Sequence, residues 1–356
     1  MSVNLLDFTI DELAEVTGLS PSFRVKQLYH GIHSGLKVSE ISVLPLETRA
    51  RLEQFAVGVE IQKAFKSADG SEKYLYQLSD GNIIEGVFMP HAYGNTLCVS
   101  TQVGCRMGCA FCASGIGGLV RNLTAGEILG QVLAVNRYKG GGKDKREITN
   151  IVLMGSGEPL DNYDNVTKFF RLVSSPDGIN ISLRNISLST CGITEKIYRL
   201  ADEGYGVTLS VSLHATTDEA RQEVMPIAKK YTIAQIIEAV KYYFGKTGRR
   251  IIYEYSMIKG KNIDYFDAVR LEQITKGYPS HVNLIMLNPV KEKNLTACTA
   301  KDAERFLQRL KDRKVSATIR RSFGNDVGGA CGQLRRSHLN DENKAKRVTK
   351  PANAKK

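Results

Sequence analysis

The sequence has no long hydrophobic run, and no basic segment followed by an apolar one at its start. A membrane-spanning helix needs roughly 18 consecutive apolar residues, and no stretch approaches that length. The first residues, MSVNLLDFTIDELAEV, carry acidic side chains where a secretory signal would carry basic ones. These absences predict a cytoplasmic protein without membrane association. Thiols stay reduced in that compartment, so clustered cysteines are expected to bind metal or catalyse rather than form disulfides.

Acidic residues are in the minority, because 49 Lys and Arg stand against 37 Asp and Glu, a formal charge of +12. Eight Lys and Arg against two acidic residues fall in residues 335–356, and a second basic stretch, RKVSATIRRSFG, occupies residues 313–324. A basic tail without apolar periodicity is typical of a disordered segment. Such a tail could serve solubility alone. The second basic stretch favours RNA or DNA as a partner.

The chain changes character several times along its length. Residues 1–55 are expected to form a small helical accessory domain of the helix-hairpin-helix kind, because TIDE is a capping box and PLETRARLEQFAVG is amphipathic. Residues 56–92 alternate on either side of SDG, which predicts a β linker with a hairpin. Residues 93–325 are the expected core. Residues 326–356 are expected to form a C-terminal segment with a flexible basic tail.

Six β-rich runs alternate with helical patterns in the core. This repetition predicts an α/β fold with a parallel sheet and right-handed crossovers. Six units fit a partial (β/α)6 TIM-like barrel better than a flat sheet, although their spacing alone leaves both open. In such a barrel the reactive groups collect at the carboxyl ends of the strands. The six runs are TLCVS, ITNIVLMG, NISLST, VTLSVSLH, RIIYEYSMI and HVNLIMLN.

Four of the seven cysteines fall in CVSTQVGCRMGCAFCASGIGG, which includes the end of the first of these strands. Cys105, Cys109 and Cys112 could hold three corners of a [4Fe–4S] cluster and leave the fourth iron open to an exchangeable ligand. A structural zinc would require four ligands. Cys98 could be the fourth, but it lies upstream on a predicted strand, and no histidine falls in the loop. The spacing favours an iron–sulfur cluster and leaves a zinc-binding RNA-binding module as the alternative.

The C-x3-C-x2-C spacing, with Phe111 before the last cysteine, resembles the radical S-adenosylmethionine (SAM) superfamily. GSGEP, residues 155–159, resembles the segment of that superfamily that binds the methionine amino group. A closer resemblance, over roughly residues 1–334, is to the RNA adenine methyltransferases of the RlmN type. It rests on FRVKQLYHGIH, TLCVSTQVGCRMGCAFCASG, VLMGSGEPLDNYDNV, LSTCG, SVSLHATTDEARQEVMPI, LNPV and ACGQL.

The resemblance implies a radical SAM core with a [4Fe–4S] cluster and two SAM molecules per turnover. The implied reaction is methylation of carbon 2 of an adenosine in 23S rRNA, at the peptidyl transferase centre, and of the adenosine 3′ of the anticodon in some tRNAs. An external one-electron reductant of the flavodoxin kind and a monomeric enzyme are implied as well. Cys105, Cys109 and Cys112 are the implied cluster ligands. The implied SAM contacts are Gly157, Glu158, Ser189, Ser212, Leu213, His214 and Asn288.

Three further residues carry the implied ping-pong methyl transfer. Cys331 accepts a methyl group from one SAM, and its methylene radical then adds to the base. Cys98 resolves the resulting protein–RNA adduct through a transient disulfide with Cys331. Glu85 accepts the proton from carbon 2. Cys191 and Cys298 match no catalytic position and are taken as structural.

Reasoning from the residues alone leaves other roles open. Cys98 could be a buried apolar side chain, and Glu85 could face water at a sheet edge. Ser189 and Asn288 could be strand-end hydrogen bonders without a ligand. The chain departs from the family pattern at Ser156, where Met is common, and at Gly328-Gly329, where an Asp and a small residue are usual.

The position of methylation is also open. Related antibiotic-resistance enzymes that methylate carbon 8 of adenine tend to have Glu-Ala where this chain has Glu158-Pro159. The sequence therefore favours carbon 2 and leaves carbon 8 as an alternative.

Overall fold

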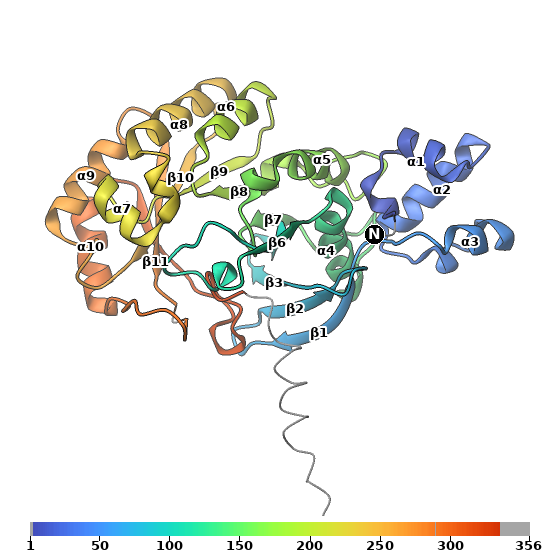
Figure 1. Cartoon of the computed structure of the whole chain (residues 1–356), viewed down its shortest axis with the longest axis horizontal. Helices are drawn as coiled ribbons and strands as arrows, with labels where there is room; N and C mark the ends of the chain where they lie inside the picture. Colours follow the sequence, from blue (N-terminus) through green and yellow to red (C-terminus); the bar gives the residue numbers. More distant parts are fainter. Residues whose placement is uncertain (1–2, 289, 335–356) are drawn as a thin grey trace, which may run out of the picture.

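The computed structural model of the chain describes residues 3–288 and 290–334 (Figure 1). The predicted basic tail, residues 335–356, lies outside the described residues. Within the described ranges, no helix combines the length and the apolar surface that crossing a bilayer demands.

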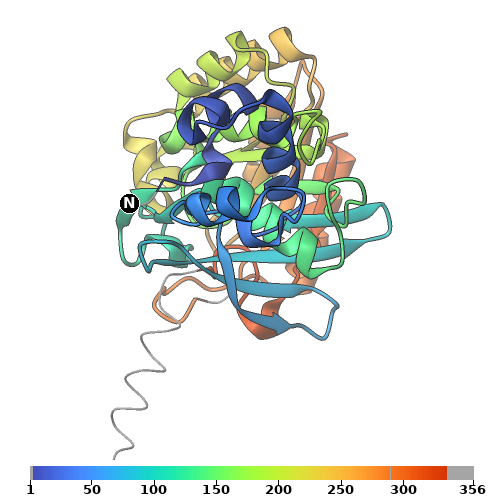
Figure 2. The same ribbon diagram turned by 90° about the vertical axis from the view of Figure 1, so that its right-hand side faces the viewer.

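A group of short helices forms the N-terminal module, which stands beside the rest of the molecule (Figures 1 and 2). It consists of η1 (Leu5–Asp7), α1 (Ile10–Thr17), α2 (Ser22–His33), η2 (Val38–Glu40) and α3 (Leu46–Leu52). The predicted capping box is confirmed, because the Thr9 N–H donates to the Glu12 carboxylate (2.8 Å) and the Glu12 N–H donates to Thr9 Oγ1 (3.4 Å). Asp7 anchors the module to the core by accepting a hydrogen bond from the Gly126 N–H (2.6 Å).

A ten-stranded sheet runs through the rest of the described chain, in the order β1-β2-β3-β4-β7-β8-β9-β10-β11-β12. Neighbours from β1 to β4 are antiparallel, and those from β4 to β12 are parallel. The strands are β1 (Glu60–Lys66), β2 (Glu72–Gln77), β3 (Ile83–His91), β4 (Gly94–Cys98), β7 (Asn150–Leu153), β8 (Ile186–Thr190), β9 (Thr208–Ser212), β10 (Ile251–Met257), β11 (Ser280–Met286) and β12 (Ala317–Arg320). Among the described residues the edge strands β1 and β12 do not pair, so the barrel is partial, as predicted.

The six predicted core strands are all present, and β12 is a seventh parallel strand that the sequence pattern does not predict. It lies within residues 313–324, the basic stretch that was expected to favour RNA or DNA as a partner. The predicted hairpin is confirmed as β2 and β3, which pair antiparallel on either side of the SDG turn. Because β3 also pairs with β4, with Val87 opposite Cys98, residues 56–92 extend the core sheet.

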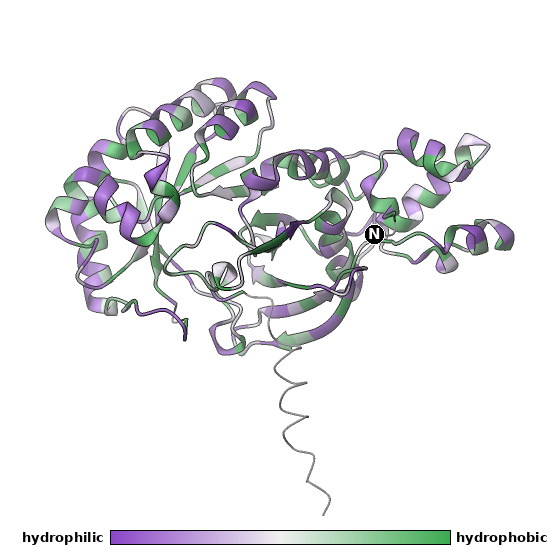
Figure 3. Cartoon of the chain, in the orientation of Figure 1, coloured by the Kyte–Doolittle hydropathy of each residue, from purple (hydrophilic) through white to green (hydrophobic). Residues whose placement is uncertain are grey.

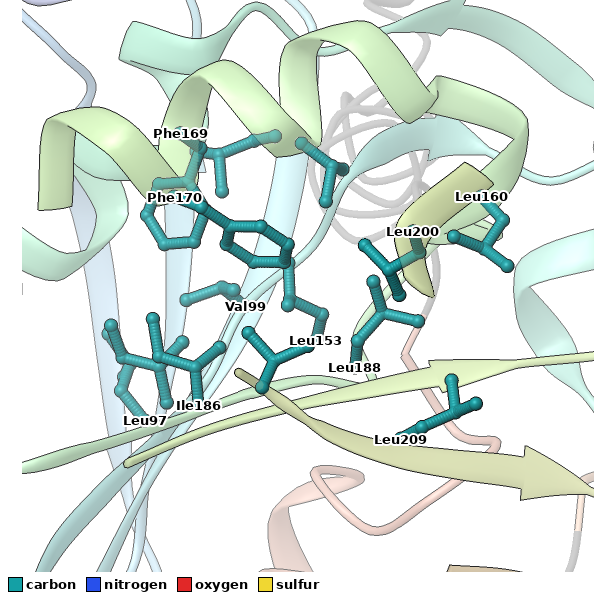
Figure 4. Packing of buried hydrophobic residues seen from close by; sticks show 14 of the residues in the cluster. Leu97, Val99, Leu153, Leu160, Phe169, Phe170, Ile186, Leu188, Leu200 and Leu209 are labelled. Atoms are coloured by element: carbon teal, nitrogen blue, oxygen red, sulfur yellow. The ribbon is translucent and has the colours of Figure 1, made fainter. Parts of the chain in front are cut away.

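Helices cover one face of the parallel strands (Figure 1). They are α4 (Ala125–Tyr138), α5 (Tyr163–Val173), α6 (Thr194–Asp202), α7 (Asp218–Val224), α8 (Ile233–Thr247), α9 (Tyr265–Thr275) and α10 (Ala300–Asp312). Leu153 and Leu188 point from the sheet toward Phe170 of α5 and Leu200 of α6 (Figure 4), and all four are at most 1 % exposed. The helices mix hydrophobic and hydrophilic residues along their length (Figure 3), as helices with one buried side do.

The opposite face of the sheet, called the inner face below, carries polar residues. Side chains alternate between the two faces of a strand. Because the residues next to them in the sequence pack against the helices, the inner face carries Asn150, Ser187, Thr208 and Asn283. A separate two-stranded ribbon, β5 (Gln102–Gly104) with β6 (Leu119–Asn122), follows β4. The remaining short turns are η3 (Ala113–Gly115), η4 (Pro159–Asn162), η5 (Leu183–Asn185), η6 (Pro226–Lys229) and η7 (Asn325–Val327).

Candidate active site

The three clustered cysteines lie on the loop between β5 and β6, shortly after β4 ends. Gly104 precedes the loop with a φ of 78°, and a Cβ there would collide with the Gly118 carbonyl, so glycine is required. The Cys105 N–H donates to that same carbonyl (3.1 Å) and closes the loop. Farther along, the Ala113 N–H donates to the Gly332 carbonyl (2.7 Å). The cysteine loop is therefore held against a segment from the far end of the chain.

One cavity, called the cluster cavity below, brings these thiols together with the carboxyl ends of the parallel strands. It is lined by Cys105, Cys109, Cys112, Gly157, Glu158, Ser189, Ser212, His214, Asn288 and Cys331, among others. Among the implied SAM contacts, Leu213 alone is absent from this lining. Its side chain is fully buried and its N–H donates to the Glu254 carbonyl (3.0 Å).

The thiols suit a cluster of several irons better than a single metal ion. In residues 3–288 and 290–334, no three His, Cys, Asp or Glu side chains are close enough together to hold one ion. A cubane binds each thiolate at its own iron, so thiols spread around a cavity meet its requirement. Cys98 does not line the cluster cavity, which argues against a four-cysteine zinc site. Burial raises the pKa of the Cys105 thiol to about 12, so this thiol is protonated until a metal displaces the proton.

The loop after β7 presents Glu158 to the cluster cavity. Gly157 has a φ of 108°, and a Cβ there would lie 2.6 Å from Cβ of Gln102, so glycine is again required. The Glu158 carboxylate accepts hydrogen bonds from the N–H groups of Cys191 (2.7 Å) and Leu160 (3.0 Å). Burial raises its pKa. The side chains of Thr190 and Cys191 also hydrogen-bond to this carboxylate, so its orientation at the cavity wall is fixed.

Gln102 is a positioning residue that the sequence does not reveal. Its fully buried side chain accepts from the Glu158 N–H (2.9 Å) and donates to Asn122 (2.8 Å) and Asp161 (3.0 Å). It thereby joins the ribbon of the cysteine loop to the loop that carries Glu158. A glutamine within an apparent turn gives no local signal of such a role.

His214 supplies a neutral ring to the wall of the cluster cavity. Its Nδ1 accepts from the Ser256 N–H (2.9 Å), which assigns the ring proton to Nε2. Burial, aided by the charge of Arg221, lowers the pKa of His214 to about 3. The ring meets Phe111 edge-on with 4.5 Å between centroids, so it is also packed against the cysteine loop.

Asn288 holds the segment that carries Cys331. Its amide donates to the Cys331 carbonyl (3.0 Å), and its carbonyl oxygen accepts from the Ser322 hydroxyl (2.9 Å). Ser189 on β8 and Ser212 on β9 lie at or next to the ends of their strands and border the same cavity. Asn288 therefore makes the protein hydrogen bonds expected of a strand-end residue, and its contact with SAM stays a prediction.

The two outlying cysteines line a second cavity, the cysteine-pair cavity, which adjoins the first. Cys98 and Cys331 both border it, and Asn288, Arg320 and Cys331 border both cavities. Both cysteines are free thiols; Cys98 is buried and Cys331 is exposed. Burial, with the neighbouring Cys331, raises the pKa of Cys98 to about 12. The structure thus places close together two thiols that lie far apart in the sequence.

Arg320 is a cation beside this cysteine pair. It ends β12, and its guanidinium lies 3.3 Å from the Glu254 carboxylate. The Cys331 thiol raises the pKa of Arg320, with a smaller effect from Glu254. Arg320 belongs to the basic stretch that was expected to bind nucleic acid, whereas its position at the end of a strand in VSATIR indicates a place at the site.

Glu85 is fully buried on β3, between two paired strands. The alternative of an edge position facing water is therefore wrong. Lys73 on β2 lies 3.2 Å from the Glu85 carboxylate and is itself 1 % exposed. Lys73 also donates to the Gly328 carbonyl (3.2 Å), just before the Cys331 segment. Glu85 shares a strand face with Val87, which lines the cysteine-pair cavity, although Glu85 itself is not among the residues that line it.

Arg221 on α7 is a second buried cation that the sequence does not reveal. Its guanidinium donates to the carbonyls of Cys191 (2.6 Å) and Ser212 (3.2 Å), so it ties the ends of β8 and β9 together behind the cluster cavity. The desolvation that comes with full burial lowers its pKa, opposed by the thiols of Cys191 and Cys109. The surrounding letters, DEARQEV, have the pattern of a solvent-facing helix.

Cys191 and Cys298 are both buried beside methionine sulfur. Cys191 Sγ lies 3.6 Å from Met107 Sδ, and Cys298 Sγ lies 3.9 Å from Met286 Sδ. Cys191 borders the cluster cavity, while Cys298 borders neither cavity. Their structural assignment stays a prediction.

Known proteins match this chain along most of its length. The model of the Radical SAM superfamily matches residues 99–271. A protein of Clostridium perfringens (strain 13 / Type A) named "Probable dual-specificity RNA methyltransferase RlmN" is 50% identical over 344 residues, covering 94% of this chain and 97% of that protein. Its namesake from Clostridium botulinum (strain Alaska E43 / Type E3) is 47% identical over 342 residues, with the same coverage.

A solved structure matches the fold as well. The crystal structure of a radical SAM methyltransferase from Sphaerobacter thermophilus superposes with a TM-score of 0.89 at 38% sequence identity. The match covers 94% of this chain and 100% of the other. The N-terminal module, the extended sheet and the Cys331 segment therefore fall within a shared architecture.

Proposed function

The chain belongs to the RlmN family of radical SAM RNA methyltransferases, and on that premise we propose that it methylates carbon 2 of an adenosine in 23S rRNA and in certain tRNAs. Two RNA substrates fit the dual specificity in the names of its relatives. Carbon 2 of adenine is electron-poor and not a nucleophile, so an electrophilic methyl group would go to nitrogen instead. Methylation at this carbon calls for radical chemistry, which family membership supplies through a [4Fe–4S] cluster and SAM.

The observation that carries this proposal is the convergence of Cys98, Cys331 and Arg320 next to the cluster cavity. Direct transfer of a methyl group from SAM to RNA would need no thiols beyond the three that are expected to hold the cluster. Cys331 borders both cavities, where Sγ can accept a methyl group, and the guanidinium of Arg320 borders the same two cavities. We infer a ping-pong reaction with two SAM molecules per turnover, one methylating Cys331 and one consumed in radical formation.

The residues of the cluster cavity have separate tasks in this scheme. Cys105, Cys109 and Cys112 would hold the cluster, and the chemistry that the cluster would supply when bound is one-electron reduction of SAM, with an external flavodoxin-like protein as the electron source. Glu158, held by two backbone N–H groups, would bind the amino group of SAM. His214, kept neutral, would donate a hydrogen bond from Nε2. Arg221 and Gln102 position these groups without reaching the cavity themselves.

Glu85 and Cys98 would complete the reaction at the base. Glu85 would take the proton from carbon 2, while Lys73 stabilises its carboxylate in the buried setting. Loss of the carbon-2 proton together with one electron, which returns to the one-electron carrier, would leave a closed-shell thioether adduct. Cys98, as a thiolate, would then bond to the sulfur of Cys331. The electron pair of the breaking sulfur–carbon bond would pass to the transferred carbon, which would take up a proton to become the methyl group. The methylated RNA leaves, and the two cysteines remain as a disulfide until they are reduced.

Mass spectrometry of nucleosides from 23S rRNA and tRNA tests this proposal in cells that lack the gene and carry a chosen variant. Wild type should restore 2-methyladenosine, and Cys331→Ala should not. Cys98→Ala should accumulate protein linked to RNA, because the adduct cannot be resolved. Cys298→Ala is the matched control, since it removes a buried cysteine outside both cavities. Formation of 8-methyladenosine would contradict the assignment to carbon 2, and product from Cys331→Ala would contradict the methyl-carrier role.

A further inference from the structure

A polar groove on the inner face of the sheet continues from the cysteine-pair cavity toward the beginnings of the parallel strands. Its volume is about 720 Å³. Strand beginnings line its floor, among them Asn150, Ser187, Thr208 and Thr318. Met89, Arg320, Arg321 and Phe323 border both the groove and the cysteine-pair cavity. A polymer whose reacting unit enters the cavity would therefore lay a neighbouring unit in the groove.

An aromatic stack stands at the rim of this groove. Tyr93 is 75 % exposed on the two-residue turn between β3 and β4. Its ring stacks on His91, with 4.8 Å between centroids and planes 11° apart, and His91 meets Phe323 edge-on at 5.0 Å. Gly94 fixes the turn, since its φ is 131° and a Cβ there would collide with Thr149. The exposed face of Tyr93 is thus held in place and open to a flat ring.

Arginine side chains line the groove, and the described residues that line it include no carboxylate. The arginines are Arg184, Arg320 and Arg321. Arg320 is engaged with Glu254. The guanidinium of Arg184 makes no hydrogen bond or ion pair with the described residues, and that of Arg321 lies over the Phe323 ring at 4.7 Å without an ion pair there. Both can therefore bind an anion.

We propose that the groove binds a single-stranded nucleotide flanking the target adenosine, with its base stacked on Tyr93 and the adjoining phosphates on Arg184 and Arg321. An exposed aromatic face combined with guanidinium groups is the arrangement that proteins use to hold single-stranded nucleic acid. Planar guanidinium groups match phosphate oxygens in pairs. This inference rests on the proposed function, in which RNA is the substrate of the cysteine pair, and it names the part of the protein that holds the neighbouring nucleotide.

Binding of a fluorescein-labelled single-stranded oligoribonucleotide with one adenosine, measured by anisotropy, tests the proposal on anaerobically prepared holoenzyme. Tyr93→Ala should weaken binding by about 5- to 150-fold, the range found when one base loses its aromatic partner. Tyr93→Phe should bind like wild type, because it keeps the ring face. Tyr265→Ala is the matched control, since Tyr265 is 53 % exposed on α9 and does not line the groove. Equal binding by wild type and Tyr93→Ala, or an equal loss in Tyr93→Phe, would overturn the proposal.

The two arginines are tested by the salt dependence of the same binding. Each phosphate contact with a single strand adds about 0.7 to the slope of log K against log salt. Arg184→Ala and Arg321→Ala should each lower that slope by about 0.7. Unchanged slopes in both variants would overturn the phosphate contacts.

Steady-state kinetics separates this inference from the proposed function. Tyr93→Ala should raise KM for the RNA and leave kcat near that of wild type, because Tyr93 lies away from the reacting atoms. An unchanged KM would overturn the stacking role. If wild type yields a product other than 2-methyladenosine, the proposed function fails, and the binding differences still decide whether the groove holds a flanking nucleotide.

Discussion

His33 makes the N-terminal module sensitive to acid. The side chain is fully buried on α2, stacked on Tyr29 with 4.0 Å between centroids. Burial, with smaller effects from His30 and Lys143, lowers its pKa to about 3. Neither ring nitrogen has a hydrogen-bond partner among the residues that the structure describes. The folded protein therefore keeps His33 neutral at pH values where the unfolded chain protonates it.

The sign and size of the effect follow from linkage. The unfolded chain binds a proton at His33 as the pH falls below about 6.5, and the folded chain does not until about 3. The contribution of the neutral His33 to the free energy of unfolding is thus fully present above about pH 6.5 and declines as the pH falls toward 3. Each unit in this window costs about 1.4 kcal/mol. Between pH 7.5 and pH 5, His33 should lower the free energy of unfolding by about 2 kcal/mol.

His33→Phe removes the titrating group and keeps the aromatic stack. Gly178 closely contacts the His33 ring, so the phenylalanine will pack differently against it. This change in packing alters the free energy of unfolding equally at both pH values, so it cancels when the two pH values are compared. Urea unfolding followed by far-UV circular dichroism at pH 7.5 and pH 5 should show the variant gaining about 2 kcal/mol on wild type. His30→Gln, on the same helix with a side chain 43 % exposed, is the control. Parallel pH dependence in wild type and His33→Phe would refute the reasoning.

Three further outcomes follow from single contacts. Gly157→Ala should weaken SAM binding in equilibrium dialysis by about 5- to 150-fold, because a Cβ at φ 108° collides with Gln102 and costs on the order of 1–3 kcal/mol. Gly206→Ala is the control and should not weaken binding, because a Cβ at Gly206 would meet no atom within 4 Å. Lys73→Met should lower the free energy of unfolding by about 3–5 kcal/mol, because the buried Glu85 loses its cation. Lys37→Met, at an exposed ion pair, should lower it by less than about 1 kcal/mol, and equal losses in the two variants would contradict this effect of burial. Anaerobic wild type should hold about four irons per chain, and Cys112→Ala should lose them while Cys298→Ala retains them; iron retained by Cys112→Ala would exclude this cysteine as a ligand.

Strand positions were predictable because each of the six runs is rich in apolar and β-branched residues. In β10, for example, IIYEYSM places hydrophobic side chains against the helices over seven residues. β12 has four residues, as β7 does, but arginine and lysine residues flank it, so its strand pattern was hidden by its charge. The position of the cysteine loop followed from the same strands, since it comes directly after the first of them.

The contacts that join distant segments were not predictable from local patterns. Gln102, Arg221 and Lys73 look like surface residues in their own segments, and their burial arises only when the sheet, α7 and the C-terminal segment come together. The proximity of Cys98 to Cys331 was expected from family resemblance, because no spacing rule links positions so far apart. A buried polar residue needs partners from elsewhere in the chain, and a single sequence does not contain that information.

The incomplete barrel would allow one sheet to serve both the proposed cysteine chemistry and the proposed binding of an RNA strand. In a closed (β/α)8 barrel, layers of side chains from all the strands fill the interior. Here β1 and β12 leave the sheet open, and small polar residues such as Ser187 and Thr208 begin the strands on the inner face. The same strands end near the cluster cavity, so the proposed binding and the proposed chemistry would occupy opposite ends of shared strands. Substitutions at strand beginnings should therefore change RNA affinity, whereas those at strand ends should change the chemical step.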